Sequence, residues 1–290
     1  LQATPTLTQF RELLHFGAAP PSEMDEVLAE PIAHSALRQL AEGISKGCLS
    51  QLAVFEFRLR PLPLALLAAV VAGCPQLRVC SVQLYSCSVE RSLLHRLLSL
   101  PRLEELQLGL QNARLGALEG ADDALSERKM SNLHTLKLQV GDERLLDALH
   151  FPQLAHLSLS HFKLSSVNGL LARAPLLRSF SALECELECA DDSSSSARAA
   201  DAKAPNSNAF VCRELRSIEL NETFITGETV AMFCRAAPNL KVLKFSKATA
   251  LARSVVAALT QAAPQQLEQL QIVHSAWAFS RFVADRKSVV

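Results

Sequence analysis

A six-residue pattern of apolar side chains, L-x-x-L-x-L, repeats along this chain of 290 residues. Residues 151–164, FPQLAHLSLSHFKL, carry it most completely. Leu157 and Leu159 fall on one face of a short strand there, and the polar residues between them fall on the other, because a strand alternates its faces at every residue. A unit this short cannot bury its apolar face alone, so it needs copies stacked on both sides.

Nine segments match the pattern when Phe, Cys, Val, Ile and one Ala count as leucine. Their first leucines are separated by 25, 26, 30, 21, 23, 38, 25 and 27 residues, and most of these intervals lie within the roughly 20–29 residues of a leucine-rich repeat. The sequence therefore predicts an α/β leucine-rich repeat solenoid of about nine to ten repeats, with a curved parallel sheet inside and helices outside. The first leucines are Leu52, Leu77, Leu103, Leu133, Leu154, Leu177, Leu215, Leu240 and Leu267.

Six of the eight intervals between successive strands contain an apolar run without strand-like alternation, which predicts a helix, and a further such run precedes the first strand. In five copies a proline stands two residues before the first leucine and marks where the helix stops, because proline cannot continue a helix. The expected helices are 33–45, 64–72, 91–100, 143–150, 167–174, 227–237 and 252–263.

The regular part of the chain is expected to span residues 33–277 as one solenoid. Residues 1–32 precede it as an N-terminal cap or degenerate repeat, with a short helix around Phe10, since solenoids need an atypical unit at their ends. Residues 189–209 are rich in Ser, Ala, Asp and Asn, which predicts a disordered insertion. A polar loop is expected at 109–129, and residues 278–290 form a C-terminal cap or tail.

The composition argues against two classes of partner. Lysine plus arginine and aspartate plus glutamate both number 29, and the basic residues are not gathered on one face, so we expect no nucleic-acid partner. The longest apolar run, near residues 64–72, is far shorter than the roughly 20 residues that span a bilayer, so we expect no membrane partner.

Eight cysteines occupy positions that suit a leucine-rich core. Cys80 replaces a core leucine, and Cys185 takes the position that asparagine or cysteine usually fills in such a repeat. Free cysteine behaves as a small buried hydrophobe, so we expect reduced core thiols and an intracellular protein, cytoplasmic or nuclear. A disulfide framework in a secreted recognition ectodomain is the alternative.

The solvent-facing side of the strands is the expected binding surface. Reading the residue between the second and third leucine positions gives mixed, mostly small or polar side chains, which suit contact with a protein partner. We find no catalytic, cofactor or metal motif, so we expect no enzyme, no cofactor and no metal. The candidate partner-binding residues are Glu56, Gln107, Lys137, His156, Ser158, Ser181, Glu219, Lys244 and Gln271.

Three segments carry a family resemblance: 74–87 (CPQLRVCSVQLYSC), 174–187 (APLLRSFSALECEL) and 237–248 (APNLKVLKFSKA). They resemble the repeats of ribonuclease-inhibitor-like and F-box/leucine-rich-repeat proteins. The resemblance implies a curved solenoid and, for many such proteins, substrate recognition for a ubiquitin ligase with linker and cullin subunits as partners. Residues 1–32 show no match to an F-box. The predicted function is therefore a non-enzymatic interaction scaffold, with an F-box-type receptor whose F-box is missing or upstream as the alternative.

Overall fold

The chain forms two compact units, Leu1–Val140 and Gly141–Val290. The computed structural model describes residues 8–11, 31–57, 63–85, 88–89, 91–111, 114–115, 132–139, 146, 150–188, 211–247, 252–262 and 264–273. The predicted insertion at 189–209, the tail at 278–290 and most of the predicted helix at 143–150 lie outside these residues.

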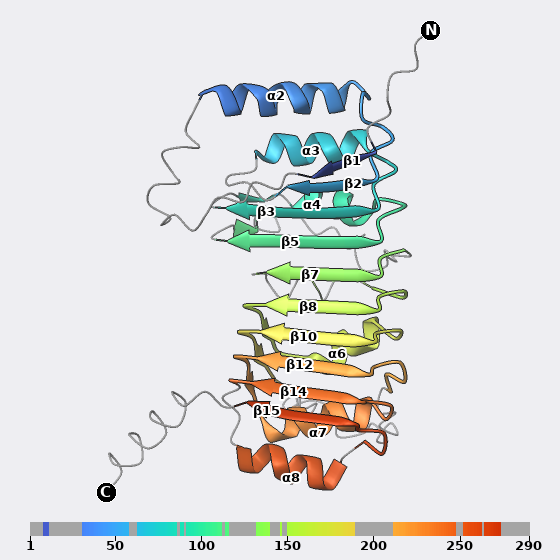
Figure 1. The fold of residues 1–290 in the computed structure, drawn as a ribbon, viewed down its shortest axis with the longest axis vertical. Coiled ribbons are helices and arrows are strands. Elements are labelled where there is room, and N and C mark those ends of the chain that lie inside the picture. Colours follow the sequence, from blue (N-terminus) through green and yellow to red (C-terminus); the bar gives the residue numbers. More distant parts are fainter. Residues whose placement is uncertain are drawn as a thin grey trace, which may run out of the picture. The chain divides into compact units, whose positions relative to one another are not determined.

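The first unit contains a row of parallel strands in chain order (Figure 1). The second and third leucine positions of each repeat predicted there fall within a strand, and the first precedes it by two residues. Neighbouring strands pair so that equivalent positions of the repeat face one another. β3 and β5 run longer than the pattern, so part of the predicted loop at 109–129 begins as strand. The strands are β1 (Gln9–Arg11), β2 (Val54–Phe57), β3 (Val79–Tyr85), β5 (Glu105–Gln111) and β7 (Thr135–Gln139), and β4 (Ser88–Val89) pairs separately with β6 (Arg114–Leu115).

The N-terminal strand corrects the expectation of a helix around Phe10. β1 pairs in parallel with β2, with Phe10 opposite Phe55. The amides of Ala53 and Val54 both donate to the carbonyl of Thr8, at 2.9 and 3.3 Å. The edge of β2 would otherwise expose unpaired backbone groups. Tertiary pairing therefore overrides the helical spacing of the local apolar residues.

Helices α2 (Pro31–Ser45) and α3 (Leu64–Gly73) pack against each other, and α4 (Arg91–Leu98) follows. α3 buries most of its uniformly apolar sequence, including Leu66, Leu67 and Val70, and exposes only the small side chains of Ala65 and Ala72. A β-carbon added at Gly73 would lie 2.5 Å from the carbonyl oxygen of Ile44 in α2. Only glycine therefore allows the two helices to approach this closely.

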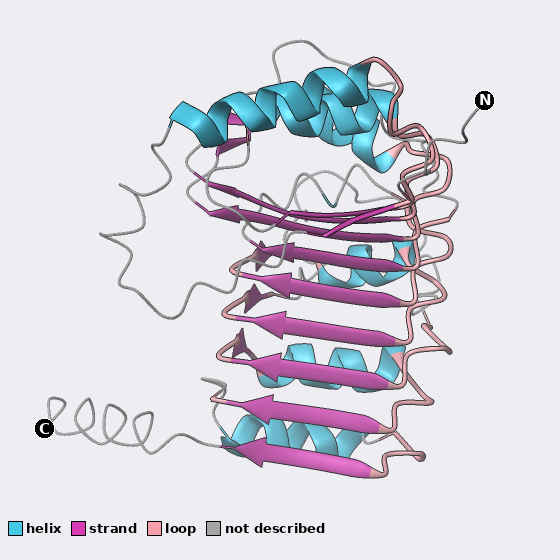
Figure 2. Cartoon of the chain, turned by 45° about the horizontal axis from the view of Figure 1, so that its top comes forward, coloured by secondary structure: helices cyan, strands magenta, loops and turns pink. Residues whose placement is uncertain are grey.

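The second unit repeats the same arrangement with five parallel strands (Figures 1 and 2). Their register keeps equivalent residues side by side, for example Leu157, Phe180 and Ile218. A second, three-stranded sheet forms where each repeat turns away from the main row. The main strands are β8 (His156–Ser160), β10 (Ser179–Leu183), β12 (Ser217–Asn221), β14 (Val242–Ser246) and β15 (Gln269–Val273), and the small sheet is β9 (Lys163–Leu164), β11 (Glu186–Leu187) and β13 (Phe224–Ile225).

Three helices lie on one side of the main strand row of this unit (Figure 2). They are α6 (Val167–Arg173), α7 (Gly227–Ala236) and α8 (Ala252–Ala262). Ser166 caps α6, and Thr226 caps α7 with its side chain accepting from the amide of Thr229. Both caps satisfy amides that a helix start leaves without partners. The helix bounds agree with those expected from the sequence to within two residues.

The prolines stand in the turns that lead into the strands. At Pro75, the amide of Leu77 donates to the carbonyl of Cys74 at 3.2 Å, and the same bond joins Leu177 to Ala174 around Pro175. Proline is favoured at this second position of a turn because its fixed φ matches the turn geometry. The prolines thus end the helices, as predicted, and also build the approach to each strand.

The core of the second unit consists of stacked triplets from neighbouring repeats. From β8 to β14, every residue at the three leucine positions is at most 3% exposed. The last repeat departs from the prediction, because Leu270 is 47% and Ile272 is 36% exposed. Among the strands that the structure describes, β15 is the last of its row and pairs with β14 on one side only. Its apolar side chains are therefore not buried as the pattern predicts.

Among the six described cysteines, all of which are free, only Cys48 is exposed. Burial raises the pKa of the Cys80 thiol to about 12 and that of Cys74 to about 11. Cys87 and Cys189 lie outside the described residues. In the described part of the chain, no helix is long and apolar enough to cross a membrane.

Candidate functional site

The candidate residues of the first unit lie in one row across neighbouring strands. Glu56 faces Ser81, Ser81 faces Gln107, and Gln107 faces Lys137. Beside this row, Arg78 holds Glu104 with two hydrogen bonds of 2.9 and 2.8 Å. The guanidinium of Arg78 lowers the pKa of the Glu104 carboxyl. The row has the predicted register, and whether it binds a partner is a prediction that the geometry does not test.

The candidate residues of the second unit form a second row, which we call the rung row: Ser158, Ser181, Glu219, Lys244 and Gln271. Ser158 and Ser181 are half-buried and small, whereas Glu219 and Lys244 are joined by a hydrogen-bonded ion pair of 2.8 Å. The register therefore places two small, neutral side chains at one end of the row, next to the charged pair of Glu219 and Lys244.

His156 raises the question of catalysis because its Nδ1 lies 2.7 Å from the hydroxyl oxygen of Ser179 on the next strand. A nucleophilic serine needs such a base, and the base needs a third group that orients it. Among the described residues, no carboxylate is hydrogen-bonded to His156, and both partners of the pair are surface residues. The pair lacks the third member of a catalytic arrangement and belongs to the polar strand face.

A row of four charged or ionisable residues follows the main strands of the second unit. His161, Glu184, Glu222 and Lys247 each come directly after β8, β10, β12 or β14 and have positive φ, from 49° to 58°. This left-handed conformation is uncommon for residues other than glycine and costs roughly 1–2 kcal/mol. The amide of each donates to the last residue of the next main strand, at 2.7–2.9 Å. These bonds hold the strained turns in place.

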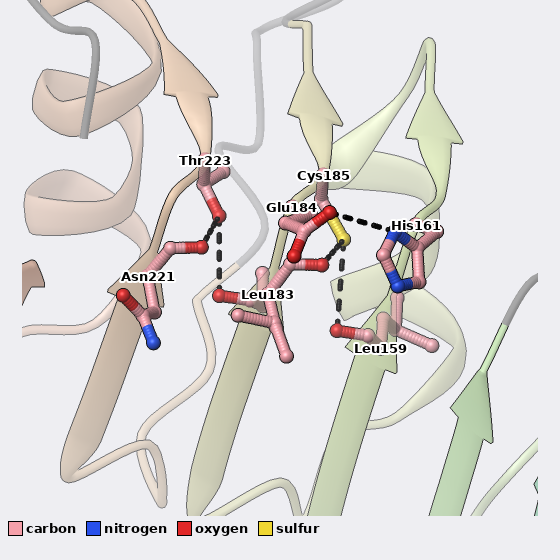
Figure 3. A network of polar contacts seen from close by, with 8 residues as sticks. Leu159, His161, Leu183, Glu184, Cys185, Asn221 and Thr223 are labelled. Carbon is pink, nitrogen blue, oxygen red and sulfur yellow. Dashed lines mark hydrogen bonds and ion pairs between the residues drawn. The ribbon is translucent and has the colours of Figure 1, made fainter. Parts of the chain in front are cut away.

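Buried side chains support the turns from within (Figure 3). At the position that asparagine or cysteine usually fills, Cys185 donates toward the carbonyls of Leu159 and Leu183, at 3.6 and 3.3 Å. The hydroxyl of Thr223 lies 2.9 Å from the carbonyl oxygen of Asn221 and 3.1 Å from that of Ala182. Buried carbonyls need such donors, so in the repeats of β10 and β12 the interior fixes the backbone from which Glu184 and Glu222 project.

Ion pairs connect the row from one repeat to the next. His161 lies 3.1 Å from Glu184, as Figure 3 shows, and Lys247 donates to Glu222 at 2.6 Å. Glu222 raises the pKa of Lys247. Glu184 and Glu222 occupy equivalent positions of adjacent repeats. Glu184 contacts the imidazole of His161 on the preceding repeat, and Glu222 contacts the ammonium of Lys247 on the following one.

An open hollow of about 580 Å³ lies between this row and the small sheet of the second unit. Phe224, opposite Glu186 on the neighbouring strand, lines it and is 50% exposed. Lys163 also lines it and lies within 3.2 Å of Glu186 and 3.6 Å of Glu188. The hollow therefore combines an exposed aromatic ring with several charged groups.

Sequence reasoning predicted the rung row, and it missed the hollow. The available signal was Phe224, an apolar residue at a repeat position where the two preceding repeats have Lys163 and Glu186. The left-handed turns had no signal, because the residues there are neither glycine nor asparagine. In the part of the chain that the structure describes, no group of three potential metal ligands comes together.

No protein-family model and no curated protein matches this sequence. Among solved structures, TLR13 in its complex with ssRNA13 is similar, with 14% identity and a TM-score of 0.32. That match covers 78% of this chain, which spans 35% of the TLR13 chain. An internalin from Listeria monocytogenes is similar with 12% identity and a TM-score of 0.26, over 87% of this chain and 97% of its own.

These similarities are too distant to carry an argument about function. The leucine-rich repeat fold is shown by the molecule itself, through parallel strands in repeat register, buried leucine positions and, in several of the described repeats, a helix between one main strand and the next. The narrower resemblance to ribonuclease-inhibitor-like or F-box proteins has no further support.

Proposed function

We propose that this protein is a non-enzymatic scaffold that binds a partner protein on the polar face of its strands. The supporting observation is the rung row, where five neighbouring strands present outward side chains in strict register. A row of parallel strands with its apolar side buried offers a continuous polar surface, and stacked repeats commonly use such extended surfaces for binding.

The size of this face limits how a partner can bind. With strands about 4.8 Å apart and about 3.3 Å per residue, five strands of five residues each cover roughly 19 by 17 Å. This is about 320 Å², whereas each side of a stable interface buries roughly 800 Å². A partner that binds this unit therefore contacts more than the rung row, and the adjacent surface is the row of turn residues His161, Glu184, Glu222 and Lys247 at the ends of the strands.

Two arginines introduced at the centre of the rung row should abolish partner binding. Ser158 and Ser181 lie opposite each other on the paired strands β8 and β10. The substitutions Ser158→Arg and Ser181→Arg together replace these two small side chains with long cations. We expect affinity capture of the intact protein from its native cells, read by mass spectrometry, to lose a defined partner by at least about tenfold. This loss corresponds to about 1.4 kcal/mol or more.

The matched control is Asn168→Arg, an exposed residue of α6 that lies outside the strand row. This variant should retain the partner, and circular dichroism should show that both variants keep the native fold. Retention of every partner by the double variant, with the fold intact, would contradict the proposed binding face.

Substrate recognition for a ubiquitin ligase is a narrower form of the proposal, supported by the repeat resemblance alone. Its test is recovery of linker and cullin subunits in the same capture experiment, and their absence would leave a plain scaffold. We also propose an intracellular location, supported by the buried free thiols. Eight titratable thiols in the unfolded, unreduced protein would agree with it, and paired cysteines would favour a secreted ectodomain.

A further inference from the structure

The hollow beside the small sheet of the second unit differs from the rung row in its chemistry. Thr223 and Ile225 are buried on either side of Phe224 in the sequence, and the ring between them is half exposed. A single exposed aromatic residue is common on protein surfaces. Phe224 is distinctive because it lines a concave site together with charged side chains on neighbouring repeats.

Carboxylates outnumber cations around this ring. Glu184, Glu186 and Glu222 line the hollow, and Glu188 lies just beyond it, sharing the ammonium of Lys163 with Glu186. The cations are Lys163 and Lys247, and the imidazole of His161 lies beside Glu184. Four carboxylates against two ammonium groups leave an excess of two negative charges when the imidazole is neutral. The hollow thus complements a cationic ligand.

We propose that this hollow binds an arginine-bearing segment of the partner protein. A guanidinium stacks on an aromatic face and forms paired hydrogen bonds to carboxylates. Phe224 supplies the face, and Glu186 on the adjacent strand stands directly opposite it. Lysine fits less well because its ammonium is a compact, strongly hydrated charge that neither stacks nor forms a planar fork.

The ion pairs already present do not block this binding. The carboxylates and the Lys163 ammonium are substantially exposed, and exposed ion pairs contribute only about 0–1 kcal/mol each. An incoming guanidinium can therefore replace a lysine as the partner of Glu186. The backbone at His161, Glu184, Glu222 and Lys247 needs no rearrangement, because hydrogen bonds to the neighbouring strands already hold these turns in place.

This inference rests on the proposed scaffold function. It states which chemical group of the partner would bind the hollow beside the rung row. The probe is a fluorescein-labelled peptide, GSRGRGS, with citrulline and lysine counterparts that remove the charge or change its shape. Binding to the intact protein is measured by fluorescence anisotropy at low ionic strength, because screening weakens such contacts. We expect the arginine peptide to bind more tightly than the lysine peptide, and the citrulline peptide to bind at least about tenfold more weakly than the arginine peptide.

The variants test the two components of the site in opposite directions. Phe224→Ser and Glu186→Gln should each weaken binding of the arginine peptide at least about threefold. Lys163→Gln should strengthen it, because Glu186 and Glu188 lose their shared cation. Glu228→Gln, an exposed carboxylate on α7 outside the hollow, should leave it unchanged, and thermal melts should show that all variants fold.

Equal binding of the citrulline peptide, unchanged binding by Phe224→Ser, or weaker binding by Lys163→Gln would overturn the inference. An absence of peptide binding would also overturn it. If the partner is nevertheless lost on mutation of the rung row, the scaffold function stands and only the arginine assignment fails. If the peptide binds as expected but the rung variant retains every partner, the proposed binding face fails instead.

Discussion

Replacing Phe180 by alanine is expected to lower the free energy of unfolding by about 3–5 kcal/mol. Phe180 occupies the second leucine position of β10, is 1% exposed, and packs on Phe233 of α7 with ring centroids 5.7 Å apart. The next inward residue, Ala182, is small, so neighbouring side chains do not readily fill the space. Domains are stable by about 5–15 kcal/mol, which makes this loss a large fraction of the total.

Urea unfolding followed by circular dichroism measures this loss. The control is Leu176→Ala, because Leu176 is 41% exposed in the turn before β10 and surface substitutions usually change stability by about 0.5 kcal/mol or less. A cost below about 1 kcal/mol for Phe180→Ala would mean that β10 does not pack on α7 as described.

Cys80 is expected to react with iodoacetamide at pH 8 about a thousandfold more slowly in the native protein than in denaturant. Burial raises the pKa of its thiol from 9.0 to about 12, and only the thiolate is the nucleophile. Each unit of pKa lowers the thiolate fraction about tenfold, and steric exclusion from the core slows the reaction further. Mass spectrometry of the labelled peptides reads the rate, with the exposed Cys48 as the internal comparison. Similar rates for Cys80 and Cys48 would place Cys80 outside the core.

The same thiol makes stability depend on pH. Well below pH 9 the Cys80 thiol is protonated in both the folded and the unfolded state and adds no pH dependence. Between pH 9 and about 12 the unfolded state releases the proton while the folded state keeps it, so stability falls as pH rises. At pH 10 this single group costs about 1.4 kcal/mol. The variant Cys80→Ala should show a shallower loss of stability above pH 9, and an unchanged slope would contradict the assignment.

The strand register was predictable because leucine spacing leaves little freedom. A shift of one residue in Leu157 and Leu159 would turn the apolar side chains to solvent, so the burial requirement alone fixes which residues face outward. Ser158, Ser181 and Glu219 therefore occupy the predicted row. The turn positions were also predictable from local sequence, because each proline fixes its own φ at a value that suits a turn.

Features that depend on partners distant in sequence were not predictable. Phe10 has apolar residues at helical spacing near it in the sequence, but it forms a strand because Gln9–Arg11 pairs with the edge of β2. Leu270 and Ile272 fit the core pattern, yet they are exposed, because within the described residues β15 pairs with β14 on one side only. Three of the residues that line the hollow, His161, Glu184 and Glu222, have positive φ. Their residue types do not predict this left-handed conformation.

The central claim, that a partner protein contacts the outward strand face, is tested most directly by site-specific photo-crosslinking. p-Benzoylphenylalanine is placed at Ser181 in the rung row or at Glu228 on α7, and the intact protein is irradiated in extract from its native cells. We predict that the Ser181 position crosslinks to one defined protein and the Glu228 position does not. Crosslinking of that protein from the Glu228 position alone would contradict the proposed binding face.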